Sequence, residues 1–249
     1  DQEHLFSLKY ADQKYLKKHP QFSFYPPLTD NDRGAKMGFE MAKWENAAKY
    51  AKLTDIKLKY LTSSVWIKLA YELPFALCDE LTITYQIDKK GFINVHAHFP
   101  GSQQAERLPE FGLSLVLSKK LDHFTYYGLG PQENYLDRKA GAYFGKYKQT
   151  VKNNFTPYLR PQECGNRSQV RYCELLDENG VGIRVQSDHN SFNFSALPYS
   201  TEQIEMADHF YELPKSNFTY LKLLANQMGV GGDDSWGAPV HSEYCFPAN

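Results

Sequence analysis

Apolar and polar residues alternate with a period of two along several short runs of the chain. Residues 65–72 form one such run, with Val65, Ile67, Leu69 and Tyr71 on one face and Trp66, Lys68, Ala70 and Glu72 on the other. This alternation predicts a β-strand with one wetter face. The same pattern predicts strands over residues 81–87, 93–98, 112–117, 123–127, 169–176, 182–186, 192–196 and 220–225. Polar segments at residues 88–91 and 177–180 predict tight turns between strands.

Helical signals are few. Met41, Trp44 and Ala48 follow the i, i+3, i+7 spacing of an amphipathic helix within residues 39–52. A second, short helix is predicted to start at Ser200, because Gln203 three residues later completes the spacing of a capping box.

Many short strands punctuated by turns predict an all-β antiparallel sandwich rather than alternating strands and helices. No tract rich in proline, glycine or serine divides the chain, and no internal repeat is visible. Residues 1–249 are therefore interpreted as a single β-sandwich domain.

The charge balance of the chain argues against two classes of partner, nucleic acids and anionic membranes. Lys and Arg number 28 and Asp and Glu number 29, so the net charge of -1 favours neither nucleic acid nor an anionic membrane. The longest apolar runs, such as residues 113–117, fall far short of the roughly 18 residues of a membrane span. The chain does not begin with Met and shows no export signal, and both a cytoplasmic and a periplasmic location stay open.

Metal binding is not predicted. The four cysteines lack a CxxC spacing and are interpreted as reduced, structural thiols: Cys78, Cys164, Cys173 and Cys245. His96 and His98 share one strand face and could chelate a metal, but no third ligand lies nearby in sequence, which favours a solvated outer face.

Two glycine-punctuated stretches stand apart from the strand pattern, at residues 127–138 and 229–237. Neither has the glycine spacing of a dinucleotide-binding or phosphate-binding loop. Their carboxylates could supply the acid and base of a glycoside hydrolase, although hydrogen-bonded loop carboxylates are the favoured interpretation: Glu133, Asp137, Asp233 and Asp234. Trp236 is either buried under its loop or displayed as an apolar platform on which a sugar can stack.

Four ordered segments carry a specific resemblance. GLGPQENYLDR at residues 128–138 is similar to the GLGPxExYxDR signature of the C-terminal domain of bacterial β-galactosidases in glycoside hydrolase family two. TDNDRG at 29–34, followed by Trp44, resembles the start of that domain, and PQECGNR at 161–167 resembles its PQExGNR stretch. MGVGGDDSW at 228–236 matches its MGxGGDDSW.

The resemblance implies a division of labour within a longer enzyme. That family's enzymes are retaining hydrolases of terminal β-galactosides such as lactose, and their catalytic Glu pair, magnesium and sodium belong to a barrel domain that this chain lacks. The resemblance thus implies a β-galactoside substrate bound in the parent active site, the catalytic barrel domain as partner, and a full-length homo-oligomer. No catalytic residue, cofactor or metal site is assigned to this chain, and the isolated chain is expected to be inactive.

The matched positions also imply roles for individual residues. Trp236 matches a tryptophan that reaches the rim of the active site and stacks on the sugar in the leaving-group subsite. Its neighbours are expected to support the loop: Asp233, Asp234 and Ser235. A structural role is favoured over sugar contact for Glu133, Tyr135, Asp137 and Arg138, with Arg138 expected to grip a carboxylate in bidentate fashion. Leu136 departs from the family, which often has Pro there.

The implied fold is a large antiparallel β supersandwich resembling galactose mutarotase, with one or two short helices and a final strand cut short near residues 243–249. Two alternatives stay open. The chain is an independent carbohydrate-binding module, or it is a small subunit that pairs with a separate catalytic chain.

Overall fold

The computed structural model describes residues 8–10, 13–188, 190–234 and 236–249. Its strands are β1 (Lys9–Tyr10), β2 (Gln13–Lys14), β3 (Gln21–Ser23), β4 (Lys52–Tyr60), β5 (Ser64–Glu72), β6 (Leu81–Asp88), β7 (Ile93–His98), β8 (Glu110–Ser118), β9 (His123–Gly130), β10 (Tyr143–Thr150), β11 (Arg167–Val170), β12 (Tyr172–Leu176), β13 (Gly182–Gln186), β14 (Phe192–Leu197) and β15 (Phe218–Gln227). Its helices are α1 (Asp30–Gly34), α2 (Met37–Lys49) and α3 (Thr201–Met206), with short 3-10 turns η1 (Pro74–Ala76), η2 (Phe210–Glu212) and η3 (Ser242–Tyr244). The predicted all-β class is confirmed, and no described helix is long and apolar enough to cross a membrane.

The described chain forms two compact units. The first is built from the residues up to Glu40 together with Pro109–Phe246, and the second from Met41–Leu108 together with Pro247–Asn249.

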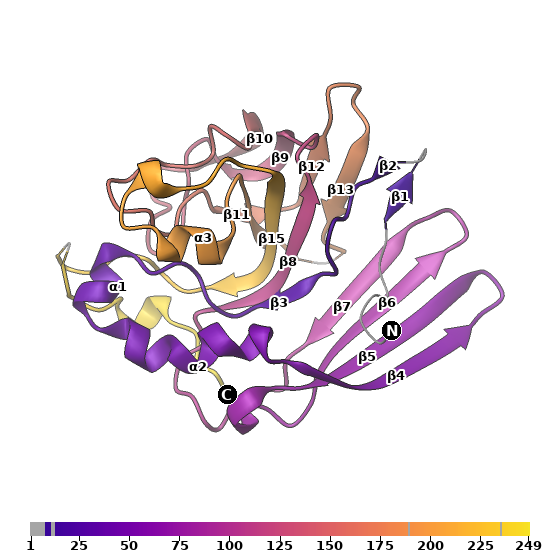
Figure 1. Ribbon diagram of the computed structural model, residues 1–249, viewed down its shortest axis with the longest axis horizontal. Coiled ribbons are helices and arrows are strands. Elements are labelled where there is room, and N and C mark those ends of the chain that lie inside the picture. Colours follow the sequence, from indigo (N-terminus) through magenta and orange to yellow (C-terminus); the bar gives the residue numbers. More distant parts are fainter. Residues whose placement is uncertain (1–7, 11–12, 189, 235) are drawn as a thin grey trace. The chain divides into compact units, whose positions relative to one another are not determined.

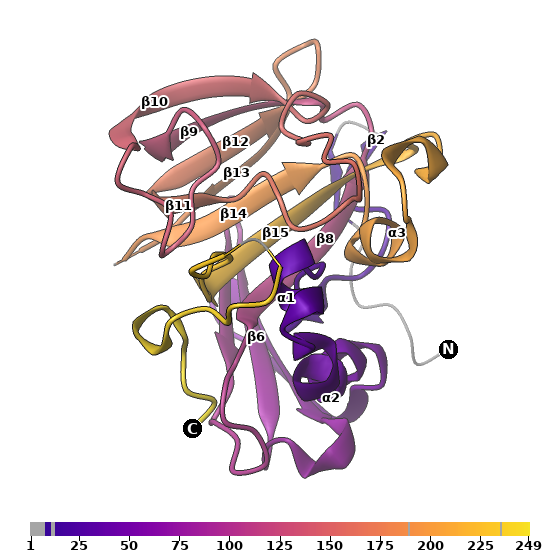
Figure 2. The same cartoon turned by 90° about the vertical axis from the view of Figure 1, so that its left-hand side faces the viewer.

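The first unit is a β-sandwich. One sheet has the antiparallel order β10-β9-β12-β13, the other has the order β11-β14-β15-β8-β3, and Figure 2 shows them as two layers. Inward-facing apolar side chains from both sheets make one core. Phe194 is central to it, because its ring lies 5.5 Å from that of Phe124 and 5.4 Å from that of Tyr126, both in edge-to-face contact. Such aromatic pairs add about 0.5–1.5 kcal/mol each beyond the area they bury.

The predicted strand over residues 169–176 is wrong as a single element. It is two strands, β11 in one sheet and β12 in the other. The pairing of β11 with β14 shifts register between Arg167 and Val170, and Gln169 has a left-handed φ of 53°. Such an irregularity bends a strand, so the chain turns the corner from one sheet to the other here.

The second unit contains the antiparallel sheet β4-β5-β6-β7, drawn in purple to pink in Figure 1. The predicted hairpin over residues 81–98 is confirmed, with Ile87 opposite Ile93. Trp44 of α2 is 2% exposed, and its Nε1 donates to the carbonyl of Arg107 (2.8 Å). The buried stripe of α2 is Met41, Trp44 and Ala47, so the prediction of Ala48 in that stripe is wrong by one position.

Local sequence signals set the ends of the shorter elements. The capping box predicted at Ser200 is confirmed, because Ser200 Oγ accepts from the Gln203 N–H (3.1 Å) and Gln203 Oε1 accepts from the Ser200 N–H (2.9 Å). The predicted turn at residues 177–180 is also confirmed, with Asp177 Oδ1 accepting from the N–H groups of Asn179 and Val181.

The five-stranded sheet buries an ion pair. Glu110 at the start of β8 is fully buried, and its Oε1 accepts from Lys222 Nζ of β15 (2.7 Å) and from Ser23 Oγ of β3 (2.6 Å). Among the described residues, Glu110 Oε2 has no hydrogen-bond partner. A carboxylate that has left water in this way depends on its cation.

A second buried carboxyl lies nearby. Glu163 and Lys222 both line a cavity of about 20 Å³, which is enough for one water molecule. Burial raises the pKa of Glu163 to about 7, while the Lys222 ammonium lowers it and the Glu110 carboxylate raises it. The hydroxyl of Tyr135 donates to Glu163 Oε1 (3.3 Å). A hydrogen bond with the Gln227 side chain lowers the pKa of Glu163, and the charge of Glu133 raises it.

This carboxyl predicts a pH-dependent stability. Because its pKa is about 7 when folded against an ordinary 4.5, Glu163 keeps its proton in the folded chain where the unfolded chain has lost it. The free energy of unfolding should therefore fall as pH rises from about 4.5 to 7, by about 2–3 kcal/mol. Urea unfolding across this range should give a flatter profile for Glu163→Gln. Parallel profiles would contradict the assignment.

Candidate functional site

Helix α1 begins with a capping box that the sequence analysis did not identify. Thr29 Oγ1 accepts from the Asp32 N–H (3.1 Å), and Asp32 Oδ2 accepts from the Thr29 N–H (2.9 Å). Burial raises the pKa of Asp32, the bonds to Thr29 and the charge of Arg33 lower it, and the carboxylate of Asp137 raises it further. Asn31 lies in the first turn, between the two residues of the capping box.

Asn31 holds the loop that carries Trp236. Its Oδ1 accepts from the Gly237 N–H (2.9 Å), and its Nδ2 donates to the carbonyls of Ala238 (2.5 Å) and Gly231 (3.3 Å). Gly34 lets the two backbones approach, because a Cβ at this position would lie 1.8 Å from the Trp236 carbonyl oxygen. Helix and loop are therefore in direct backbone contact.

A carboxylate within the loop, that of Asp234, also holds the loop backbone. Asp234 Oδ1 accepts from the N–H groups of Trp236 (3.0 Å), Gly237 (2.9 Å) and Ala238 (2.9 Å). These backbone bonds, that of Ala238 first, lower the pKa of the Asp234 carboxyl. Asp233 Oδ1 lies 2.9 Å from His241 Nε2, and Ser235 lies outside the described residues.

Of the two arrangements considered for Trp236, the structure has the displayed one. The side chain is 76% exposed, although its backbone is fixed at both the amide, by Asp234, and the carbonyl, against Gly34. An exposed indole on a fixed backbone is a flat apolar surface that bends little when a ligand stacks on it.

Glu133 organises a second part of the site. Its Oε2 accepts from the Gly165 N–H (2.6 Å) and from Thr156 Oγ1 (3.1 Å), and its Oε1 accepts from the Tyr158 hydroxyl (3.0 Å). Arg138 does not form the expected bidentate pair with a carboxylate. One nitrogen of Arg138 lies 3.5 Å from Glu133 Oε1, and its guanidinium faces the ring of buried Tyr135 with the carbon 5.9 Å from the centroid.

Asp137 brings the segment 128–138 onto the Trp236 loop. Its Oδ2 accepts from the Gly231 N–H (2.7 Å), and a Cβ on Gly229 would lie 2.6 Å from its Cγ. Thus Glu133 binds the segment 156–165 and Asp137 binds the loop at 229–231. The four segments of the family resemblance, far apart in sequence, meet through Asn31, Glu133 and Asp137.

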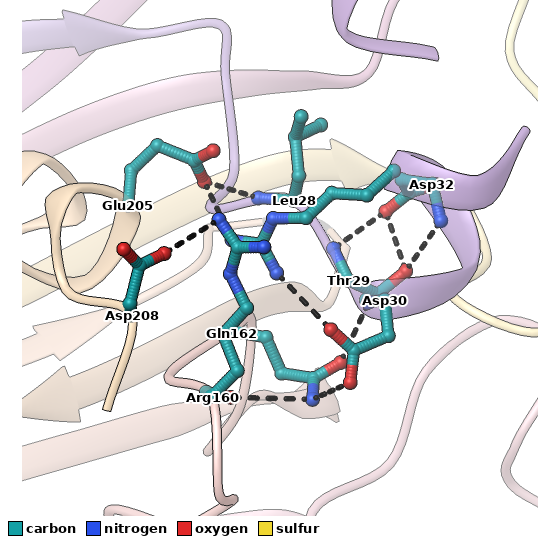
Figure 3. Close-up of polar contacts among 9 residues, drawn as sticks. Leu28, Thr29, Asp30, Asp32, Arg160, Gln162, Glu205 and Asp208 are labelled. Carbon is teal, nitrogen blue, oxygen red and sulfur yellow. Dashed lines mark hydrogen bonds and ion pairs between the residues drawn. The ribbon is translucent and has the colours of Figure 1, made fainter. Parts of the chain in front are cut away.

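Other residues of α1, with Leu28 just before it, take part in a network of polar contacts drawn in Figure 3. Glu205 Oε2 accepts from the Leu28 N–H (2.7 Å) and from Arg33 (3.4 Å). Gln162 pairs with Asp30 twice, since its Oε1 accepts from the Asp30 N–H (3.0 Å) and its Nε2 donates to Asp30 Oδ2 (3.2 Å). These contacts attach α1 to α3 and to the segment around residue 160.

The described residues contain no group of three His, Cys, Asp or Glu side chains placed to hold a metal ion. His96 and His98 lie on β7 with parallel rings 6.5 Å apart. At the Trp236 loop, Asp137 and Asp234 accept hydrogen bonds from backbone N–H groups.

Comparison with known proteins agrees with this architecture. The family model for the β-galactosidase small chain matches residues 2–249. This match covers nearly the whole chain and defines the family to which it belongs. The chain belongs to the β-galactosidase small chain family.

Its relatives differ in length. The chain is 54% identical over 242 residues to a β-galactosidase of Lactobacillus delbrueckii subsp. bulgaricus, a match over 97% of this chain and 24% of the relative. It is 45% identical over 240 residues to a β-galactosidase of Streptococcus thermophilus, over 96% of this chain and 23% of the relative. The chain is 30% identical over 272 residues to a β-galactosidase small subunit of Latilactobacillus sakei, a match over 97% of this chain and 85% of the relative. The chain therefore spans about a quarter of the first two relatives.

Proposed function

We propose that this chain is the non-catalytic, C-terminal part of a β-galactosidase of glycoside hydrolase family two, and that Trp236 is its contact with substrate. The indole stacks on the sugar in the leaving-group subsite at the rim of the active site. The observation that carries the proposal is the exposed indole of Trp236 on a loop held by Asn31 and Asp137.

The chemistry of stacking fits this position. The faces of hexoses present C–H groups that pack on the electron-rich face of an aromatic ring. Because the backbone of Trp236 is already fixed by Asp234 and by the contact with Gly34, little freedom remains to be lost when the sugar binds. A preorganised platform of this kind orients the leaving group without taking part in bond breaking.

The bond-breaking groups belong elsewhere in the enzyme. A retaining glycosidase needs two carboxyl groups about 5–5.5 Å apart across the scissile bond. The four candidate carboxylates of residues 127–138 and 229–237 instead form hydrogen bonds within the fold: Glu133, Asp137, Asp233 and Asp234. Hydrolysis is therefore assigned to the catalytic part, together with the magnesium and sodium that the resemblance implies for it. The chain alone is expected to hydrolyse no β-galactoside.

The relatives support a larger catalytic partner. Two of them are β-galactosidases in which the matching region is about a quarter of the length, and one is a small subunit of nearly this chain's length. Both arrangements, a domain of a longer chain and a separate small subunit, fit a chain that works with a larger catalytic partner. The homo-oligomer implied by the resemblance belongs to that complete enzyme.

Trp236→Ala in the complete β-galactosidase tests the proposal. Loss of the platform should weaken inhibition by glucose about 5–30-fold, because a stacked ring contributes about 1–2 kcal/mol. Inhibition by galactose should change less than about twofold, since galactose occupies the other subsite. Tyr143→Ala is the matched control, because Tyr143 is 73% exposed on β10 and forms no part of the loop.

Equal weakening of glucose and galactose inhibition would contradict the platform role. Turnover of a chromogenic β-galactoside by the purified chain alone would contradict its assignment as the non-catalytic part. Quenching of intrinsic fluorescence by galactose, glucose or lactose in the isolated chain would favour an independent carbohydrate-binding module instead.

A further inference from the structure

Four large apolar side chains are exposed together beside α3, and we call them the Leu159 patch: Leu159, Met206, Phe210 and Tyr211. Their exposed fractions are 85%, 78%, 50% and 70% respectively. The two segments that carry them are joined, because the Phe210 N–H donates to the Leu159 carbonyl (3.3 Å). The rings of Phe210 and Tyr211 meet edge to face with centroids 6.0 Å apart. Exposed apolar side chains gathered in one place mark an interaction surface.

The patch has the polar border typical of a protein interface. Arg160 lies 3.2 Å from Asp208, between the two segments of the patch (Figure 3). His209 stacks on the ring of Tyr211 with centroids 5.0 Å apart and lies 3.2 Å from Glu212. Aromatic residues, methionine and arginine are enriched at the centre of protein–protein interfaces, and their rims are polar.

Helix α1 joins the Leu159 patch to the Trp236 loop. The N–H groups of Leu28 and Asp30, at the start of α1, donate to Glu205 and Gln162, which adjoin the patch in sequence. Asn31 of the same helix accepts from the Gly237 N–H of the loop. Figure 2 shows α1 between α3 and the yellow C-terminal segment, and α1 has only five residues, about 7.5 Å of helix. The segments next to the patch and the Trp236 loop are therefore both attached to α1 and the residues just before it.

We propose that this surface, the Leu159 patch with α1 and Trp236, is where the catalytic part of the β-galactosidase docks. The inference rests on the proposed function for the identity of the partner. Because the chain covers 24% of the Lactobacillus relative, most of such an enzyme lies outside it. Trp236 completes an active site only when the catalytic part approaches its loop, and the Leu159 patch is the apolar surface that adjoins that loop.

Cysteine labelling of the complete enzyme tests the docking. Leu159→Cys and Met206→Cys replace exposed side chains, so neither change disturbs the core of the chain. Tyr143→Cys, equally exposed on β10, is the matched control. If the patch is covered, a maleimide should label positions 159 and 206 at least about tenfold more slowly than position 143 in the native enzyme. All three should label at the same rate after denaturation in urea, with each position quantified by peptide mass spectrometry.

Equal labelling rates in the native enzyme would overturn the proposal. Protection that disappears on dilution while activity is kept would also overturn it, because the patch would then be covered by a second copy of the enzyme. The result is independent of the inhibition experiment. A protected patch with unchanged glucose inhibition in Trp236→Ala would support the docking surface and refute the platform. An unprotected patch with weakened glucose inhibition in Trp236→Ala would support the platform and refute the docking surface.

Discussion

Lys222→Met is expected to lower the free energy of unfolding by about 3–5 kcal/mol, the largest effect anticipated for a single change in this chain. Lys222 Nζ lies 2.7 Å from Glu110 Oε1, and the Glu110 side chain is fully buried. Removal of the ammonium leaves a carboxylate in the sheet with only the Ser23 hydroxyl as a donor among the described residues. Urea-induced unfolding of parent and variant measures the loss.

The double variant Glu110→Gln, Lys222→Met is the control for this experiment. It removes both charges, and replacing a buried pair by neutral groups of similar size is often nearly neutral in free energy. The double variant should therefore recover most of the stability that the single variant loses. If the single and double variants unfold at the same urea concentration, the ion pair is not the cause of the loss.

Gly34→Ala is expected to displace the Trp236 loop. The added methyl carbon would lie 1.8 Å from the carbonyl oxygen and 2.4 Å from the carbonyl carbon of Trp236, so backbone must move. Such overpacking costs about 1–3 kcal/mol, and here the loop is the part that gives way. In the complete enzyme, glucose inhibition should weaken as much as in Trp236→Ala, although the indole is still present.

Gly141→Ala is the matched control, because a Cβ at Gly141 meets nothing within 4 Å. Its glucose inhibition and its urea midpoint should both match those of the parent enzyme. A Gly34→Ala enzyme with unchanged glucose inhibition would show that Trp236 acts without the support of α1. Acrylamide quenching of tryptophan fluorescence gives a second measurement of the displacement.

The fold was predictable where apolar side chains alternate and not where they do not. β5, β6 and β7 were predicted because apolar and polar residues alternate along each of them. β4 was missed, since the bulge between Leu53 and Asp55 changes the spacing of apolar residues from two to three between Leu53 and Ile56. The helix was predicted to continue to residue 52 because residues 39–52 are good helix formers, whereas α2 ends at Lys49.

β10 was missed for a different reason. It is an edge strand of its sheet, and most of its side chains are exposed or half-buried, Tyr143 and Phe144 among them. A strand that pairs through its backbone at an edge needs no buried row, so periodicity does not identify it. Its pairing with β9 is visible only in the folded chain.

The contacts around Trp236 were not predictable from the sequence. The resemblance proposed Trp236 as a sugar contact and favoured a structural role for Glu133 and Asp137. Asn31 and Gly34 lie in the motif at residues 29–34 but were assigned no role, because their partners are about 200 residues away. The capping box at Thr29 was not predicted, because its fourth residue is Asp32 instead of the usual Glu or Gln.

The bond from Asn31 to Gly237 also bears on when the site forms during synthesis. The two residues are 206 positions apart, so α1 leaves the ribosome long before the loop that it will hold. At about 5–20 residues per second, the helix waits on the order of 10–40 seconds for its partner. The sandwich core itself waits for Leu221 of β15, which ends at Gln227, so the tryptophan platform is completed only after this strand. The platform is thus among the last features of the chain to be assembled, and its presence reports that translation has reached residue 237.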